Sequence, residues 1–196
     1  MTTILRSLLV GSLLLTACKG GDKAGDKSAP AATPASSSEK SGADLTGGAK
    51  APAGITLTPT PVPFGTASLP TSDGWAVPKD AQPMQVEGKD GTVIMFQSQD
   101  GIQPDQLDDY LHDYNDVQKR DAPKYAETGH TKGTVAGATA ARVEGTFDNG
   151  TKFKTRDYIV ITKSGKLAAI SGRAPVGPAA DQLPALVDAI AASIKL

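Results

Sequence analysis

The four Phe, the one Trp and the four Tyr of this chain all lie at or after position 64, and this distribution limits where a core can form. Large aromatic rings dominate the apolar area that a core buries. The chain has 196 residues, so the part from Phe64 onward is long enough for one cooperative domain. We therefore expect a single globular domain over residues 64–196 and no separate core before it.

The charge balance restricts the class of partner. The chain carries 20 Lys and Arg against 21 Asp and Glu, a formal net charge of −1. Binding to nucleic acid requires a clear excess of basic side chains to neutralise phosphates, so no nucleic-acid partner is expected. Cys18 is the single cysteine, which excludes an intramolecular disulfide and any zinc site with two or more thiolates.

A short apolar run lies near the N-terminus. Arg6 precedes it, and residues 7–15 form a stretch of nine residues. A membrane span needs about 20 apolar residues, so this run is too short to cross a bilayer. A basic residue followed by a short apolar region is typical of a secretory signal, and we predict a signal peptide over residues 1–17.

Leu15-Thr16-Ala17-Cys18, directly after this run, resembles the lipobox of bacterial lipoproteins. The resemblance implies cleavage before Cys18, a diacylglycerol on its thiol and an N-acyl lipid on the new amine. The alternative is a free or buried thiol. Two or three acyl chains would anchor the protein firmly, because each buried methylene contributes about 0.8 kcal/mol. In Gram-negative lipoproteins an aspartate after the cysteine favours the inner membrane, so Lys19 favours the outer membrane, facing the periplasm or the cell surface.

Residues 18–63 are predicted to be a disordered linker. They are rich in Ala, Gly, Ser, Thr, Pro, Lys and Asp and contain no ring. Such a segment cannot bury enough apolar surface to offset the entropy of ordering it. Residues 55–58 are its one strand-like piece and a candidate first edge strand.

The rest of the chain predicts an α+β fold with an antiparallel sheet flanked by helices. A helix is expected from Pro104, with one apolar stripe and an acid-to-base charge order that suits its dipole. Contiguous apolar residues at 158–161 indicate a strand covered on both faces. The expected strands are 84–88, 92–98, 129–135, 138–147, 152–162 and 166–173, and a closing helix begins near residue 181.

This order resembles the PsbP-like α/β/α sandwich, shared by the photosystem subunit PsbP, a eukaryotic Ran-binding release factor and the bacterial lipoprotein DcrB. The resemblance rests on Trp75, the hairpin corner at 137–140, the Asn149-Gly150 turn and the closing helix. It implies a binding or assembly factor without catalysis. No functional residue of that family maps onto this chain.

No residue of the sequence is assigned a catalytic role. His112 and His130 are the two histidines, and neither belongs to a recognisable Ser–His–Asp arrangement. The chain has no Gly-x-Ser-x-Gly motif and no phosphate-cradling glycine loop. We therefore predict that the protein is not an enzyme.

An acidic helix face, residues 105–116, is the strongest candidate for a metal. Asp105, Asp109, His112 and Asp116 fall within roughly 60° of one another on a helix. Carboxylates with one imidazole suit a divalent ion such as Mn²⁺, Zn²⁺ or Ca²⁺. The alternative is an ordinary solvated face in which Asp116 pairs with Arg120.

Charged residues on two adjacent strands form a second candidate set. They can pair across the strands or form a face that binds a partner, and the sequence leaves both open. Its members are Arg142, Glu144, Lys152, Lys154 and Arg156.

Together these patterns predict a lipid-anchored lipoprotein of the cell envelope. Its C-terminal domain is expected to be a non-enzymatic binding or assembly module for an unknown envelope protein. The alternative function is divalent-metal binding by the acidic helix face. No cofactor is expected apart from the lipid on Cys18 and this metal.

Overall fold

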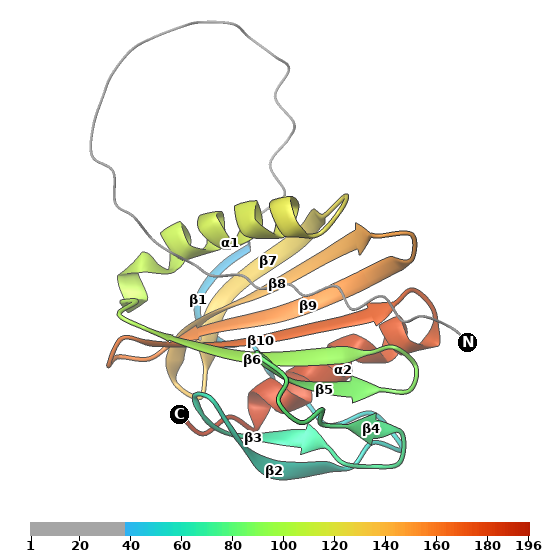
Figure 1. Ribbon diagram of the computed structural model, residues 1–196. Helices are drawn as coiled ribbons and strands as arrows, with labels where there is room; N and C mark the ends of the chain where they lie inside the picture. Colours follow the sequence, from blue (N-terminus) through green and yellow to red (C-terminus); the bar gives the residue numbers. More distant parts are fainter. Residues whose placement is uncertain (1–37) are drawn as a thin grey trace, which may run out of the picture. The chain divides into compact units, whose positions relative to one another are not determined.

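The computed structural model describes residues 38–196, and their side chains from residue 42 (Figure 1). An eight-stranded sheet forms its centre, in the order β1-β7-β8-β9-β10-β6-β5-β4. All neighbouring strands pair antiparallel except β1 and β7, which are parallel. The strands are β1 (Ser38–Asp44), β4 (Trp75–Ala76), β5 (Met84–Gly88), β6 (Val93–Asp100), β7 (Ala126–Val135), β8 (Ala138–Asp148), β9 (Lys152–Ile161) and β10 (Lys166–Pro175).

The hairpin turns lie where the sequence predicts them. Gly137, Gly150 and Gly165 have φ of +76°, +103° and +81°, a left-handed conformation that glycine adopts without strain. The Asp148 carboxylate also accepts the Gly150 N–H at 2.9 Å, which closes the turn between β8 and β9. The four strands predicted between residues 129 and 173 are confirmed, and each pairs antiparallel with the next.

Two helices cover opposite faces of the sheet (Figure 1). A 3₁₀ turn, η1 (Pro104–Gln106), leads into α1 (Leu107–Asp121), and α2 (Pro178–Ala192) closes the domain. The predicted α+β fold with flanking helices is confirmed, although α2 begins three residues earlier than expected because Pro178 occupies its first turn. Within residues 38–196, no helix combines the length and apolar character that a membrane span needs.

Strand β9 contributes to the core on both sides, as its contiguous apolar residues predict. Tyr158 and Val160 belong to the larger core beneath α2, and Ile159 and Ile161 belong to the smaller core beneath α1. All four side chains are at most 1% exposed. Even-numbered residues of β9 therefore face α2 and odd-numbered residues face α1.

The boundary predicted between linker and domain lies too late in the chain. Strand β2 (Leu57–Val62) precedes Phe64 and pairs with β3 (Gly65–Pro70) in a separate two-stranded sheet. This placement agrees with the candidate edge strand at 55–58, and β2 tolerates its prolines because only one neighbour requires hydrogen bonds. Leu45 and Val62 are also buried. Residues 1–37, with the predicted signal peptide, Cys18 and half of the linker, lie outside the described residues.

Candidate functional site

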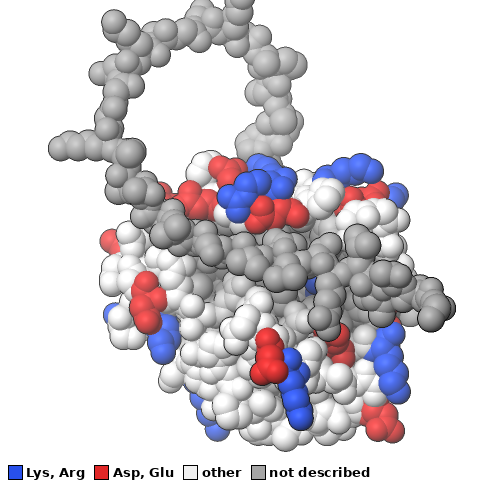
Figure 2. Space-filling view, viewed as in Figure 1, with Lys and Arg blue, Asp and Glu red and all other residues white. Residues whose placement is uncertain are grey.

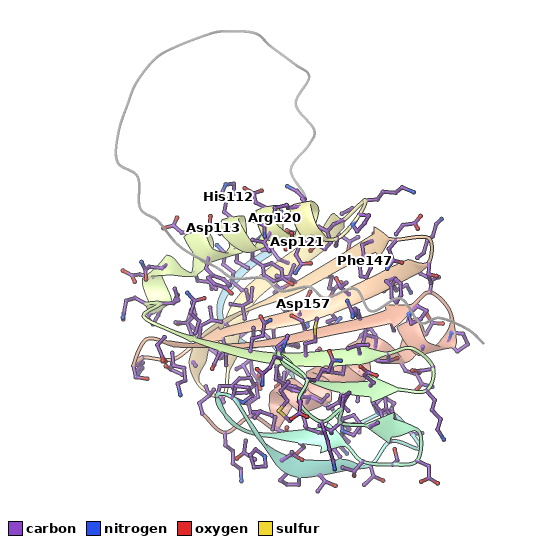
Figure 3. The ribbon with its side chains drawn as sticks, in the orientation of Figure 1. His112, Asp113, Arg120, Asp121, Phe147 and Asp157 are labelled. Atoms are coloured by element: carbon purple, nitrogen blue, oxygen red, sulfur yellow. The ribbon has the colours of Figure 1, made fainter. Side chains whose placement is uncertain are left out.

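A carboxylate buried beneath α1 is the most unusual feature of the domain. Asp157 lies on β9 opposite Val143 of β8, and its odd position turns it toward α1 (Figure 3). It is 4% exposed. Asp157 directly precedes the four apolar residues that lie in both cores, so the strand that forms the centre of the sheet also carries this carboxylate into the interior.

Four hydroxyl groups from separate elements surround this carboxylate. We call them, with Asp157, the Asp157 cluster. Gly145 of β8 leaves room for two of them, because a Cβ there would lie 2.9 Å from Tyr125 Oη and 3.0 Å from Thr155 Oγ1. The four residues are Tyr114 of α1, Tyr125 of the connection to β7, Thr155 of β9 and Ser171 of β10.

Burial dominates the electrostatics of the Asp157 cluster. It raises the pKa of Asp157 from 3.8 to about 7, while the nearby hydroxyls and the Gly172 N–H favour the charged form and lower the pKa by less. Burial likewise raises the pKa of Tyr114 and Tyr125, and the Asp157 carboxylate raises both further. A perturbed carboxyl group of this kind marks a candidate functional position.

The polar atoms of the Asp157 cluster are incompletely satisfied. In the described part of the chain, Tyr114 Oη, Tyr125 Oη and Thr155 Oγ1 are buried and make no hydrogen bond of good geometry. Buried polar groups normally have a partner in the protein or an ordered water. The cluster therefore has capacity for a further small polar species.

A second polar network lies on the other face of β9, beneath α2. The Arg156 guanidinium binds both oxygens of Asp188 on α2, with Nε–Oδ1 and Nη2–Oδ2 distances of 2.7 Å. Its Nη1 also donates to Glu144 Oε1 at 2.9 Å. Tyr158 Oη donates to Asp188 Oδ1 at 2.7 Å and lies 3.2 Å from the Leu45 carbonyl oxygen. This network connects the sheet to α2 and to the segment after β1.

The charged residues predicted on adjacent strands thus do pair, in part. Arg156 of β9 and Glu144 of β8 pair across the two strands, whereas Arg142 approaches Glu144 within β8 at 3.5 Å and Lys154 approaches Asp181 of α2 at 3.3 Å. Two of the partners, Asp181 and Asp188, come from α2, which the sequence pattern does not indicate. Asp188 lies 32 positions from Arg156 along the chain, and no local pattern connects them.

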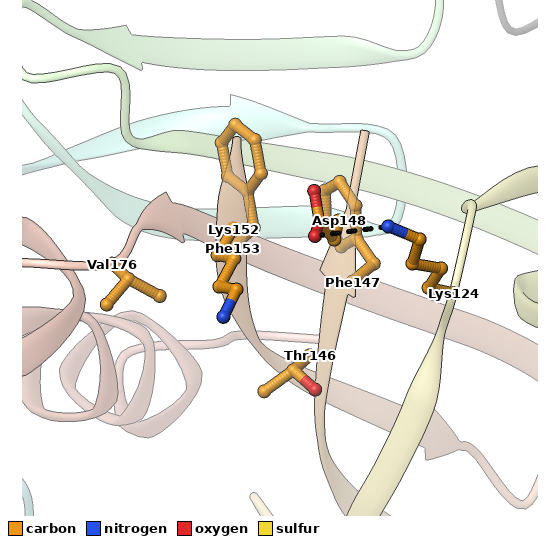
Figure 4. Close-up of a pocket in the computed structure, with 7 residues that line it drawn as sticks. All are labelled: Lys124, Thr146, Phe147, Asp148, Lys152, Phe153 and Val176. Atoms are coloured by element: carbon orange, nitrogen blue, oxygen red, sulfur yellow. Dashed lines mark hydrogen bonds and ion pairs between the residues drawn. The ribbon is translucent and has the colours of Figure 1, made fainter. Parts of the chain in front are cut away.

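A shallow depression lies at the end of the sheet (Figure 4). It has a volume of about 240 Å³. The rings of Phe147 and Phe153 stack there at 4.7 Å and 5°, and Val176 beside them is 56% exposed. Lys124, one of two lysines at its rim, lies 3.5 Å from the Asp148 carboxylate.

The residues predicted to hold a metal lie on or just before α1. Acidic and basic side chains are interspersed over this helix (Figure 2). His112 Nε2 lies 3.7 Å from Asp116 Oδ2, and both side chains are mostly exposed. In the described part of the chain neither forms a hydrogen bond or ion pair with Asp105 or Asp109. Among residues 38–196, no three His, Cys, Asp or Glu side chains are placed to share a metal.

The ion pairs on this face differ from the one that the sequence predicts. Asp116 approaches His112 and Lys119, at 3.7 and 3.9 Å, while Arg120 turns to Asp121 at 2.7 Å. The expected pair between Asp116 and Arg120 is therefore replaced by pairs with nearer partners. His130 lies on the same side of the sheet and contacts Glu127 at 2.7 Å.

The metal hypothesis makes a direct prediction. A bound ion stabilises the folded state by RT ln(1 + [L]/Kd), so Mn²⁺, Zn²⁺ or Ca²⁺ should raise the Tm of the full chain. Replacing His112 with alanine should remove the rise, whereas His130→Ala should keep it. A Tm that none of the three ions changes would exclude a metal on this face.

Comparison with known proteins extends to the fold alone. No family model and no curated protein matches the chain. The cyanobacterial PsbP (CyanoP) of Synechocystis is 13% identical, with a TM-score of 0.47 over 70% of this chain and 91% of that one. The Ran-binding protein Mog1p of Saccharomyces cerevisiae is 12% identical, with a TM-score of 0.48 over 70% and 89%. Protein PA94 of Pseudomonas aeruginosa, of unknown function, is 11% identical, with a TM-score of 0.34 over 60% and 82%.

Proposed function

We propose that the protein is a lipid-anchored lipoprotein of the cell envelope whose C-terminal domain is a non-enzymatic binding or assembly module for another envelope protein. Two features support the proposal. Cys18 and the lipobox-like residues that precede it support the anchor, and the Lys19 that follows favours the outer membrane. The depression beside Val176 provides the observation that carries the binding role, because it combines an exposed apolar side chain with a stacked ring pair.

The binding role is tested by crosslinking and affinity capture of the full chain in its own cells. We expect Val176→Asp to lose a partner that the wild type captures, because a carboxylate beside the ring pair would have to be desolvated on binding. Val77→Asp is the matched control, since Val77 is 50% exposed and lies outside the depression. Equal loss in both variants, or no partner above background in the wild type, would contradict the proposal.

The anchor is tested separately. Replacing Cys18 with alanine should leave a full-length precursor, because the thiol that receives the diacylglycerol is gone. Immunoblotting of membrane and soluble fractions would measure both size and location. Ser12→Ala, within the apolar run, is the control and should be processed normally. Normal processing and membrane attachment of Cys18→Ala would refute lipidation.

A further inference from the structure

The side-chain atoms of the Asp157 cluster that could coordinate a ligand are all oxygens. Asp157 contributes the one carboxylate, and Tyr114, Tyr125, Thr155 and Ser171 contribute hydroxyl groups. Three of these hydroxyls are buried and make no hydrogen bond of good geometry in the described part of the chain, although Tyr114 and Thr155 lie close enough to the carboxylate to lower the pKa of Asp157. A buried polar group without a good hydrogen bond is unfavourable, so three such groups at one place indicate a further small occupant.

The charges around the cluster favour a positive occupant. The groups that shift the pKa of Asp157 are hydroxyls and one backbone N–H, with no Lys, Arg or His among them. On this side of the sheet Glu127 and His130 of β7 pair with each other at 2.7 Å, and Lys132 of β7 pairs with Asp108 at 2.6 Å. Arg173 of β10, opposite Thr155, interacts with Glu87. Among the described residues none of these cations is paired with Asp157, so hydroxyl groups and one backbone N–H are what favour its ionised form. A buried unpaired charge is so unfavourable that it must be protonated or neutralised by a bound cation.

We propose that the Asp157 cluster binds one small monovalent cation of the Na⁺ or K⁺ type, held by the Asp157 carboxylate and the hydroxyl oxygens of Tyr114, Tyr125 and Thr155. Oxygen-only ligands select hard cations over transition metals, which prefer nitrogen and sulfur. A single carboxylate neutralises a single positive charge, whereas Ca²⁺ and Mg²⁺ sites are usually built from several carboxylates or substrate phosphates. The proton and the cation compete for the same carboxylate.

Thermal unfolding of the full chain in detergent tests this site. The measurements use sodium, potassium or N-methyl-D-glucamine chloride at one ionic strength, because the last cation is too large for a buried site. Near pH 8.5 we expect a Tm about 3 °C or more higher in sodium or potassium, as for a cation at roughly tenfold its Kd. Near pH 5, where Asp157 is protonated, we expect the difference to disappear.

Variants test whether the difference in Tm between the salts arises at the Asp157 cluster. Asp157→Asn should abolish the difference between salts, and Tyr125→Phe should reduce it by removing one ligand and keeping the ring. Tyr158→Phe is the matched control, because it removes a buried hydroxyl from the opposite face of the same strand. It should keep the whole difference.

Two outcomes would overturn the proposal. Equal Tm values in the three salts near pH 8.5 would mean that water alone occupies the cluster, and a difference that persists in Asp157→Asn would place the cation elsewhere. Crystals grown with Tl⁺ provide a direct measurement that does not depend on the variants folding. An anomalous peak beside the Asp157 carboxylate is expected, and its absence would equally contradict the site.

Discussion

Replacing Asp157 with asparagine is expected to raise the Tm near pH 8 by about 5 °C or more and to flatten the dependence of stability on pH. Asparagine has the shape of aspartate but carries no charge, so it removes the cost of an ionised carboxylate in the interior. Asp157 is 4% exposed, and little solvent screens that charge. Unfolding curves in urea at several pH values, with N-methyl-D-glucamine as the only added cation, would measure the effect.

The pKa values of Asp157 in the folded and unfolded states determine whether stability rises or falls with pH. The pKa of Asp157 is about 7 in the folded protein and near 3.9 in an unfolded chain. Between these values the folded state binds more protons than the unfolded state, so the stabilising contribution is complete below about pH 4 and is lost as the pH rises through 7. Three pH units correspond to at most about 4 kcal/mol in the free energy of unfolding.

Other carboxylates act in the opposite direction and require a control. Hydrogen bonds lower the pKa of Asp44, Asp121 and Asp148, so these groups favour folding above the pKa of the unfolded chain and less so in acid. The difference between wild type and Asp157→Asn removes their contribution. His130→Gln removes the nearest imidazole and should retain the wild-type pH dependence. If Asp157→Asn shows the same curve as the wild type, Asp157 is not the titrating group.

Much of the fold could be predicted because its signals are local. The Asn149-Gly150 turn needs only a glycine that adopts positive φ, and the strands on either side show their period within ten residues. The stripe of α1 is equally local, and Leu107, Tyr110, Leu111 and Tyr114 do pack on the smaller core. The sequence pattern therefore predicts an element correctly where all the residues that specify it lie within one continuous segment.

The early part of the domain could not be predicted in this way. Leu45 is a single apolar residue in a polar segment, yet its N–H donates to the Thr134 carbonyl at 2.9 Å and its carbonyl accepts from Arg142 at 3.3 Å. Gly133 permits this approach, because a side chain there would lie 2.8 Å from Leu45 Cδ2. Contacts between residues 89 and 97 positions apart leave no periodic trace in the sequence.

The Asp157 cluster was missed for the same reason. A polar residue at an inward-facing position of a strand was visible, because Asp157 alternates with Ile159 and Ile161. The sequence of the strand does not show that α1 and the loop after it place Tyr114 and Tyr125 next to Asp157. The candidate metal residues are easier to recognise in the sequence because their spacing is regular. An exposed, solvated helix face shows the same regular spacing.

Replacing Asp188 with asparagine is expected to lower the free energy of unfolding by about 3 kcal/mol, because it leaves the Arg156 guanidinium without its main counter-charge. The Arg156 and Asp188 side chains are 12% and 16% exposed, so neither can be rehydrated without moving α2. Glu144 stays beside Arg156 at 2.9 Å but is 42% exposed and offsets part of the loss. Urea unfolding at neutral pH would measure the change.

The same strand and helix provide the control. Lys154 and Asp181 also connect β9 to α2, at 3.3 Å, with exposures of 47% and 75%. Asp181→Asn should therefore cost less than about 1 kcal/mol, including its favourable position in the first helical turn. Replacing Arg156 with methionine and Asp188 with leucine together should recover most of the loss, because no charge is then stranded. If Asp188→Asn costs no more than Asp181→Asn, solvent reaches Arg156, and the network beneath α2 does not hold that helix to the sheet.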